Sequence, residues 1–166
     1  MSEASYQVVM DIGKPEAWQR LRDLSLAHYY VPGLVKTEIT TERREGPGVS
    51  RRVYQSATRY LEETVTQWDE GNGFTIRLHK GEKDAPFRDA FFRYELKDAG
   101  NGKTRLITTM GYTPPLGGVG RVLDKWILNR VISKVIRDVA LSMKLFYETG
   151  EPTDKTALKS LKQSLA

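Results

Sequence analysis

Few side chains in this chain belong to the types that catalyse reactions or bind metals. The sequence contains no Cys and two His, His28 and His79, which are 51 residues apart. Thiol nucleophiles, disulfides and Cys-ligated zinc or iron–sulfur centres are therefore excluded, and we expect no metal and no cofactor. A histidine can act as an acid or a base near neutral pH, and His28 precedes two Tyr, which makes it a candidate for acid–base catalysis. His79 falls on the polar side of a β pattern, where we expect a surface position.

Arg130 and Lys134 are the next candidates, because they lie one helical turn apart. Together they could direct positive charge at a carboxylate or phosphate of a ligand. The simpler interpretation is a solvated helix face. Lys134 also stands four residues before Asp138, a spacing that favours a surface ion pair.

The glycines Gly117, Gly118 and Gly120 precede a helical pattern, as glycines do in phosphate-binding loops. The chain lacks the G-x-x-x-x-G-K-[ST] motif and a preceding parallel βα unit, so we reject a phosphate site. With Pro114 and Pro115 on one side, the glycines are better interpreted as a flexible lid over a pocket entrance.

Length and composition predict one globular domain. The chain has 166 residues, 39% of them hydrophobic and 28% charged, which is enough apolar area for a core. The net charge is +5, and residues 103–166 hold 11 basic and 5 acidic side chains. We interpret this bias as a basic helix face, and we do not expect nucleic acid as a partner. No segment has the apolar length of a membrane span and none resembles a secretory signal, so we expect a cytoplasmic protein.

The first half of the chain predicts strands with one helical interruption. Residues 6–12 form a β-prone run, and Pro15 suits the first turn of a helix over 15–24. A second short helix is expected over 25–30. Further strands are expected near residues 34–44, 49–56, 59–69, 73–80, 87–97 and 103–113. The connections contain Gly and Asn, which tight hairpins require, so the sheet is predicted to be antiparallel.

These strands alternate apolar and polar residues, which predicts one dry face. The cover for this face is a long amphipathic helix over residues 119–149, with Gly150 after its end. A strongly curved sheet cannot touch a straight helix along its whole length, so we expect an apolar cavity between the two.

Four segments resemble the START-like superfamily, also called SRPBCC or the polyketide cyclase/dehydrase and lipid-transport family. They are Trp18–Leu24 with Tyr30–Gly33, the "E-x-V-x-x-W-D" pattern in Leu61–Asp69, the Pro- and Gly-rich lead Tyr112–Trp126, and Leu141–Gly150. The resemblance covers about residues 5–150 and implies an α+β helix-grip fold. In that fold a seven-stranded curved antiparallel sheet wraps on a long C-terminal helix, and two short helices follow the first strand.

The resemblance implies a START-like ligand-binding domain over residues 1–150 and a tail or short helix over 151–166. The cavity between sheet and long helix is expected to bind a hydrophobic small molecule, such as a lipid, an isoprenoid or a polyketide-like compound. The side chains expected to line it, with plain core packing as the alternative for each, are Tyr30, Phe74, Ile76, Phe92, Tyr94, Met110, Tyr112, Leu123, Trp126 and Ile127.

Two other function classes stay open. One is a cyclase or dehydratase, in which an enclosed pocket folds a reactive chain and His28, Tyr112 or Arg130 handles protons. The other is a START-like module that binds a protein or the ribosome through the basic C-terminal third and tail. The oligomeric state cannot be inferred from these patterns.

Overall fold

The computed structural model describes residues 1–81, 83–84, 88–113 and 121–165, with side chains described outside 83–84 and 121–126. Its elements follow the chain as β1 (Ser2–Met10), α1 (Lys14–Leu21), a 3₁₀ turn (Leu24–Leu26), α2 (Ala27–Tyr30), β2 (Lys36–Ile39), β3 (Ser50–Tyr54), β4 (Tyr60–Asp69), β5 (Gly73–Lys80), β6 (Lys83–Asp84), β7 (Arg88–Gly100), β8 (Lys103–Thr113), α3 (Arg121–Thr149) and α4 (Lys155–Ser164).

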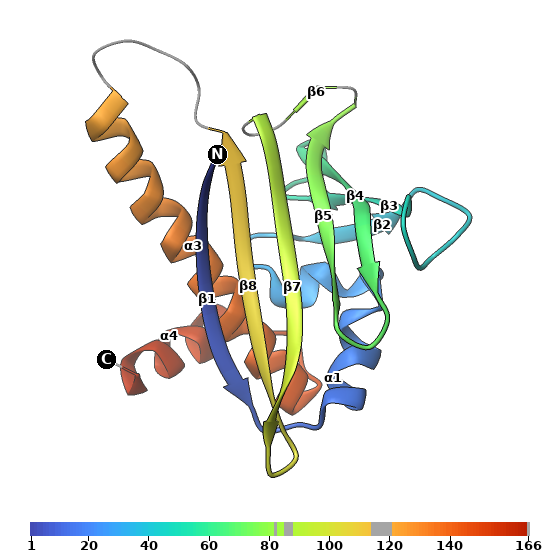
Figure 1. Cartoon of the computed structure of the whole chain (residues 1–166), viewed down its shortest axis with the longest axis vertical. Coiled ribbons are helices and arrows are strands. Elements are labelled where there is room, and N and C mark those ends of the chain that lie inside the picture. The colour runs from blue at the N-terminus through green and yellow to red at the C-terminus, as the bar shows by residue number, and fades with distance from the viewer. Residues whose placement is uncertain (82, 85–87, 114–120, 166) are drawn as a thin grey trace.

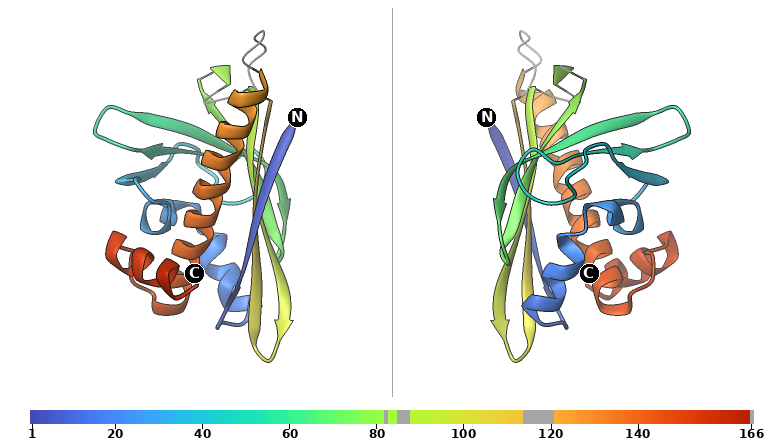
Figure 2. Two further views of the ribbon diagram at one scale, coloured as in Figure 1. Left: turned by 90° about the vertical axis from the view of Figure 1, so that its left-hand side faces the viewer. Right: turned by 90° about the vertical axis from the view of Figure 1, so that its right-hand side faces the viewer.

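The strands form one antiparallel sheet in the order β1-β8-β7-β5-β4-β3-β2, with β6 attached to β5. The first and last strands of the order lie far apart, and the sheet bends between them (Figure 1). In the side views α3 and β2–β4 lie on the same side of the layer formed by β1, β8 and β7 (Figure 2). This is the predicted helix-grip arrangement of seven strands and a long C-terminal helix, with a two-residue strand added within the described residues.

Several predicted elements differ in extent from the structure. The first strand, expected over 6–12, covers Ser2–Met10, and the helix expected over 15–24 covers Lys14–Leu21. The strand expected over 34–44 is shortened to β2, because the chain turns away after Thr40 into a loop closed by the Thr41 hydroxyl. This hydroxyl donates to the carbonyl of Arg43 and accepts from the amide of Ser50. The weak tail pattern after residue 150 becomes a regular helix, α4. Its Asp154 side chain caps the first turn by accepting from the amide of Ala157.

The core lies between the inner face of the sheet and the helices. Strand residues of the inner face alternate with partly exposed ones, as in β7, where Ala90, Phe92, Tyr94 and Leu96 are buried. Trp18 of α1 packs edge-on against Trp68 of β4 and so closes one end of this core. Ile132, Ile136, Val139 and Met143 of α3 cover the other end at helical spacing.

Gly73 begins β5 at a position that other residues tolerate poorly. Its φ is +151°, and a Cβ there would overlap the carbonyl oxygen of Tyr94 on β7. Gly71, two residues earlier, also has positive φ, at +80°, but a Cβ there would meet open space. The close approach of β5 to β7 therefore depends on the missing side chain of Gly73.

Gly73→Ala is expected to lower the free energy of unfolding by about 2–4 kcal/mol, because backbone overlap adds to the conformational strain. Gly71→Ala is the matched control and should cost only about 1–2 kcal/mol, since the strain is conformational alone. Urea denaturation of both variants measures the difference. Equal losses would contradict the role assigned to the β5–β7 approach.

Candidate functional site

α3 covers only part of the inner face of the sheet. It packs mainly on β1 and β8, and toward its N-terminal end it diverges from β1 (Figure 1). Along the diverging half, Ile127, Val131 and Val135 are 51%, 54% and 45% exposed. Their spacing of four residues places them in one row on the helix. Within the part of the chain that the structure describes, a row of apolar side chains thus has no cover where α3 leaves the sheet.

The inner wall of the sheet contains the predicted dry-face residues. All of those on the strands are buried, as is Tyr30 on α2: Phe74, Ile76, Phe92, Tyr94, Met110, Tyr112 and Tyr30. Phe92 stacks on Tyr94 at a centroid distance of 5.1 Å, and Tyr94 lies 5.3 Å from Phe74. Burial on this wall is confirmed, whereas contact with a ligand stays a prediction for each residue.

A charged pair lies among these apolar side chains. Arg51 of β3 is 2% exposed, and its Nε donates to a carboxylate oxygen of Glu63 on β4 at 2.6 Å. Its Nη1 donates to the backbone carbonyl of Leu24, also at 2.6 Å. Burial lowers the pKa of Arg51, but the charge and hydrogen bond of Glu63, together with the nearby phenols of Tyr30 and Tyr94, raise it by more, so the pKa lies above its ordinary value. Arg51 therefore keeps its positive charge inside the protein.

Three tyrosines share the surroundings of this pair. Burial raises the pKa values of Tyr30, Tyr94 and Tyr147, and the positive charge of Arg51 lowers each of them by less. These phenols therefore stay protonated and act as hydrogen-bond donors, not as bases. Among the described residues, the buried hydroxyl of Tyr147 has no hydrogen-bond partner, and the buried hydroxyl of Tyr30 lies beside the guanidinium of Arg51.

Arg51 and Glu63 are absent from the residues predicted from the sequence, although a signal was present. Arg51 alternates with Val49 and Val53, and Glu63 alternates with Leu61 and Val65, so both charges stand on the apolar side of their strands. The hairpin joining the strands pairs Arg51 directly with Glu63. Opposite charges at paired inward positions of a hairpin indicate a buried ion pair.

His28 makes its side-chain contacts with β2 and Tyr29, not with Arg51, Glu63 or the three tyrosines. Its ring Nδ1 is 3.1 Å from the hydroxyl of Thr37 on β2, and its backbone amide donates to the same oxygen. The ring also packs on Tyr29 at a centroid distance of 4.2 Å. These contacts join α2 to β2, which is a structural role.

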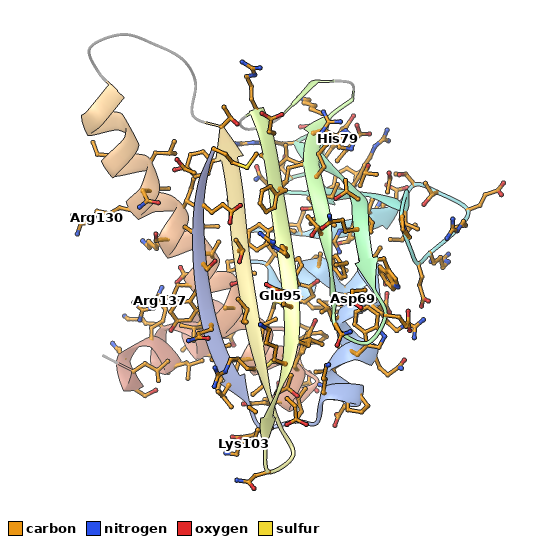
Figure 3. All side chains as sticks on the ribbon, in the orientation of Figure 1. Asp69, His79, Glu95, Lys103, Arg130 and Arg137 are labelled. Carbon is orange, nitrogen blue, oxygen red and sulfur yellow. The ribbon has the colours of Figure 1, made fainter. Side chains whose placement is uncertain are left out.

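The three proposed catalytic candidates are not brought together. The side chain of Arg130 is exposed and points away from the sheet (Figure 3). Tyr112 is buried near the end of β8, paired in register with Ser2 of β1. Their common use in one proton transfer, together with His28 on α2, finds no support in this geometry.

Several other predictions have different outcomes. Asp138 forms its ion pair with Lys162 of α4 at 2.7 Å, not the local pair expected with Lys134. The Nε2 of His79 is within 2.8 Å of the hydroxyl of Thr64, so this side chain is partly buried in a cross-strand contact. Two predicted features lie outside the described residues. They are the side chains of Leu123 and Trp126, and the part of the expected lid that follows Thr113.

The outer face of the sheet, in contrast to the apolar inner face, is polar. A hollow of about 470 Å³ lies there and is lined by polar and charged side chains, including Gln67, Arg93 and Glu95. Asp69 and Glu95 lie on the face of the sheet toward the viewer in Figure 3, opposite to α3. This hollow does not offer the apolar surface that a hydrophobic ligand requires.

Arg51→Met is expected to lower the free energy of unfolding by about 3–5 kcal/mol, because it leaves the Glu63 carboxylate buried without its partner. The double variant Arg51→Met, Glu63→Leu should recover most of that loss, since no unpaired charge remains. Chemical denaturation of the single and double variants gives the coupling energy.

Arg52→Met is the matched control, since Arg52 pairs with Glu62 at 3.0 Å on a more exposed part of the same hairpin. It should cost about 1 kcal/mol or less. A loss for Arg51→Met no larger than this would show that the inner pair is not isolated from water.

A family model described as polyketide cyclase / dehydrase and lipid transport matches residues 1–144. No curated protein matches the sequence. Among solved structures, a protein from Thermobifida fusca has a TM-score of 0.71 at 14% identity, with 89% of this chain and 93% of the other covered.

Two further structures have the same fold. An aromatase/cyclase from a Streptomyces species has a TM-score of 0.67 at 17% identity, covering 89% of this chain and 93% of its own. A START superfamily protein from Mycobacterium smegmatis has a TM-score of 0.67 at 12% identity, covering 88% and 97%. The helix-grip arrangement and the match over residues 1–144 together show that this chain belongs to the polyketide cyclase/dehydrase and lipid-transport family.

Proposed function

We propose that this protein binds a hydrophobic small molecule, such as a lipid, an isoprenoid or a polyketide-like aromatic compound, between the sheet and α3. The observation that carries the proposal is the row of exposed Ile127, Val131 and Val135 where α3 leaves the sheet. Exposed β-branched residues on a core helix cost free energy unless another apolar surface covers them. A ligand of this class provides that surface.

Arg51, Glu63, Tyr30, Tyr94 and Tyr147 together form an inner polar cluster, and this cluster favours a ligand with a neutral polar end. Arg51 is already neutralised by Glu63 at 2.6 Å, so the pair presents no net charge to a ligand. The buried hydroxyls of Tyr30 and Tyr147 stay protonated. The hydroxyl of Tyr147 has no partner among the described residues, and that of Tyr30 faces Arg51, which has no acceptor for the phenol proton. Hydroxyl donors without partners favour a ligand that carries a carbonyl or hydroxyl oxygen over one that carries a carboxylate.

A second candidate function is the cyclisation or dehydration of a polyketide-like chain. It is favoured by one observation, the concentration of Arg51, Tyr30, Tyr94 and Tyr147 in one buried region. Protonated phenols next to a guanidinium polarise a carbonyl oxygen and so assist enolisation. Arg51 and these tyrosines replace His28, Tyr112 and Arg130 as the residues to test for that chemistry. Binding of a protein or ribosome partner stays a prediction from the basic C-terminal third.

The direct test is displacement of the fluorescent probe 1-anilinonaphthalene-8-sulfonate, with farnesol and palmitate as competitors. Both should compete, and farnesol should compete at lower concentration because its polar end is neutral.

The triple variant Ile127→Ser, Val131→Ser, Val135→Ser should bind the probe about tenfold more weakly, since apolar contact area is lost.

Val9→Ser is the matched control, because Val9 is an exposed valine of β1 on the outer face of the sheet. It should leave probe affinity unchanged. The proposal fails if the wild-type protein binds no apolar compound, or if Val9→Ser and the triple variant weaken binding equally.

A further inference from the structure

The C-terminal helix α4 lies beyond the part of the chain that the family model matches, which ends at residue 144. It nevertheless makes specific contacts with the domain. Leu158 is buried, and Lys162 pairs with Asp138 of α3 at 2.7 Å. α4 is therefore docked on the C-terminal half of α3, and Figure 2 shows it on the same side of the sheet as α2.

The segment between α3 and α4 is hydrogen-bonded to α2 as well as to α3. The backbone amide of Thr153 donates to the carbonyl of Tyr29 in α2 at 2.9 Å. The hydroxyl of the same residue donates to the carbonyl of Ser142 in α3 at 2.7 Å. Thr153 thus ties α2 to α3 by two hydrogen bonds, and the docking of α4 holds Thr153 in place.

α2 is part of the wall that separates the inner polar cluster from solvent. The side chain of Tyr30 is buried and packs edge-on against Tyr147 of α3 at a centroid distance of 6.0 Å. The charge of Arg51 acts on the hydroxyls of both tyrosines. Movement of α2 away from α3 would uncover Tyr30 and, behind it, the Arg51–Glu63 pair.

The chain that follows α2 has space beneath it. A hollow of about 520 Å³ lies between this segment and α4, lined by Pro32, Leu34, Val35, Ser142 and Leu158 among others. Val35 is 62% exposed, and Gly33 has a φ of +86°. In the segment from Val31 to Val35, Val31 and Leu34 pack on the core, whereas Val35 stays exposed beside the hollow. The bond from Thr153 to Tyr29 adds to the ring contacts of Tyr29 and Tyr30 with Phe146 in attaching α2 to α3.

We propose that α4 is a strap that controls the exchange of ligand by holding α2 against α3. When the strap is docked, α2 closes the inner cluster. When the strap is released, α2 and residues 31–35 swing over the hollow and open a path to it. This inference rests on the ligand site proposed above, and it concerns the rate of exchange more than the affinity.

The test compares strap variants in the full-length chain. Thr153→Val removes the hydroxyl bond to Ser142, and Lys162→Ala removes the ion pair to Asp138. The matched controls are Thr156→Val and Lys159→Ala, because both side chains are exposed on α4. Stopped-flow binding and release of 1-anilinonaphthalene-8-sulfonate gives the association and dissociation rate constants.

In the double variant Thr153→Val, Lys162→Ala both rate constants should rise about fivefold or more, and Kd should change less than twofold. The control pair should match the wild type. Rate constants that stay at the wild-type values in the double variant would overturn the strap.

Amide hydrogen exchange separates failure of the strap from failure of the ligand site. Amides of residues 29–35 should exchange faster in the double variant than in the wild type or the control pair, and those of β7 and β8 should not change. If the wild type binds no probe, the proposed function fails while this measurement still tests the strap. Unchanged exchange over residues 29–35 would overturn it.

Discussion

The rest of the structure depends on how a straight helix covers the inner face of a bent sheet. Strand twist and the bulge between Val65 and Gln67 carry β4, β3 and β2 out of the layer formed by β1, β8 and β7. α3 lies mainly along β1 and β8 and cannot follow the bend. Its C-terminal half is covered by the sheet and by α2, whereas its N-terminal half keeps three β-branched side chains half exposed.

The same geometry explains why an ion pair is tolerated inside the domain. β3 and β4 lie where α3 makes few contacts. The inward Arg51 of β3 reaches the 3₁₀ turn at Leu24, and Trp68 of β4 packs on Trp18 of α1. Arg51 compensates for its loss of hydration with Glu63 and the carbonyl of Leu24. The pair fixes the position of the short helices against the sheet, and it surrounds the nearby tyrosines with charge that is balanced overall.

α4 adds a layer that the family match does not include. It docks on α3 through Leu158 and Lys162, and through Thr153 it reaches α2. A small number of polar contacts therefore connects the end of the chain to the wall of the inner cluster. No helix among the described residues has the length and apolar character needed to cross a membrane.

The sequence by itself determined the elements and their order, because alternation in strands, helical spacing in α3 and Gly-containing hairpins are local signals. It also identified which strand residues face inward, from Phe74 to Tyr112. Only the tertiary structure decided which side chains meet. Arg51 and Glu63 are each a single charge within an apolar pattern, and only the register of the hairpin shows that they face each other. The separation of His28 from Arg130 and the docking of α4 on Asp138 depend on packing between residues distant in the chain, which no local pattern encodes.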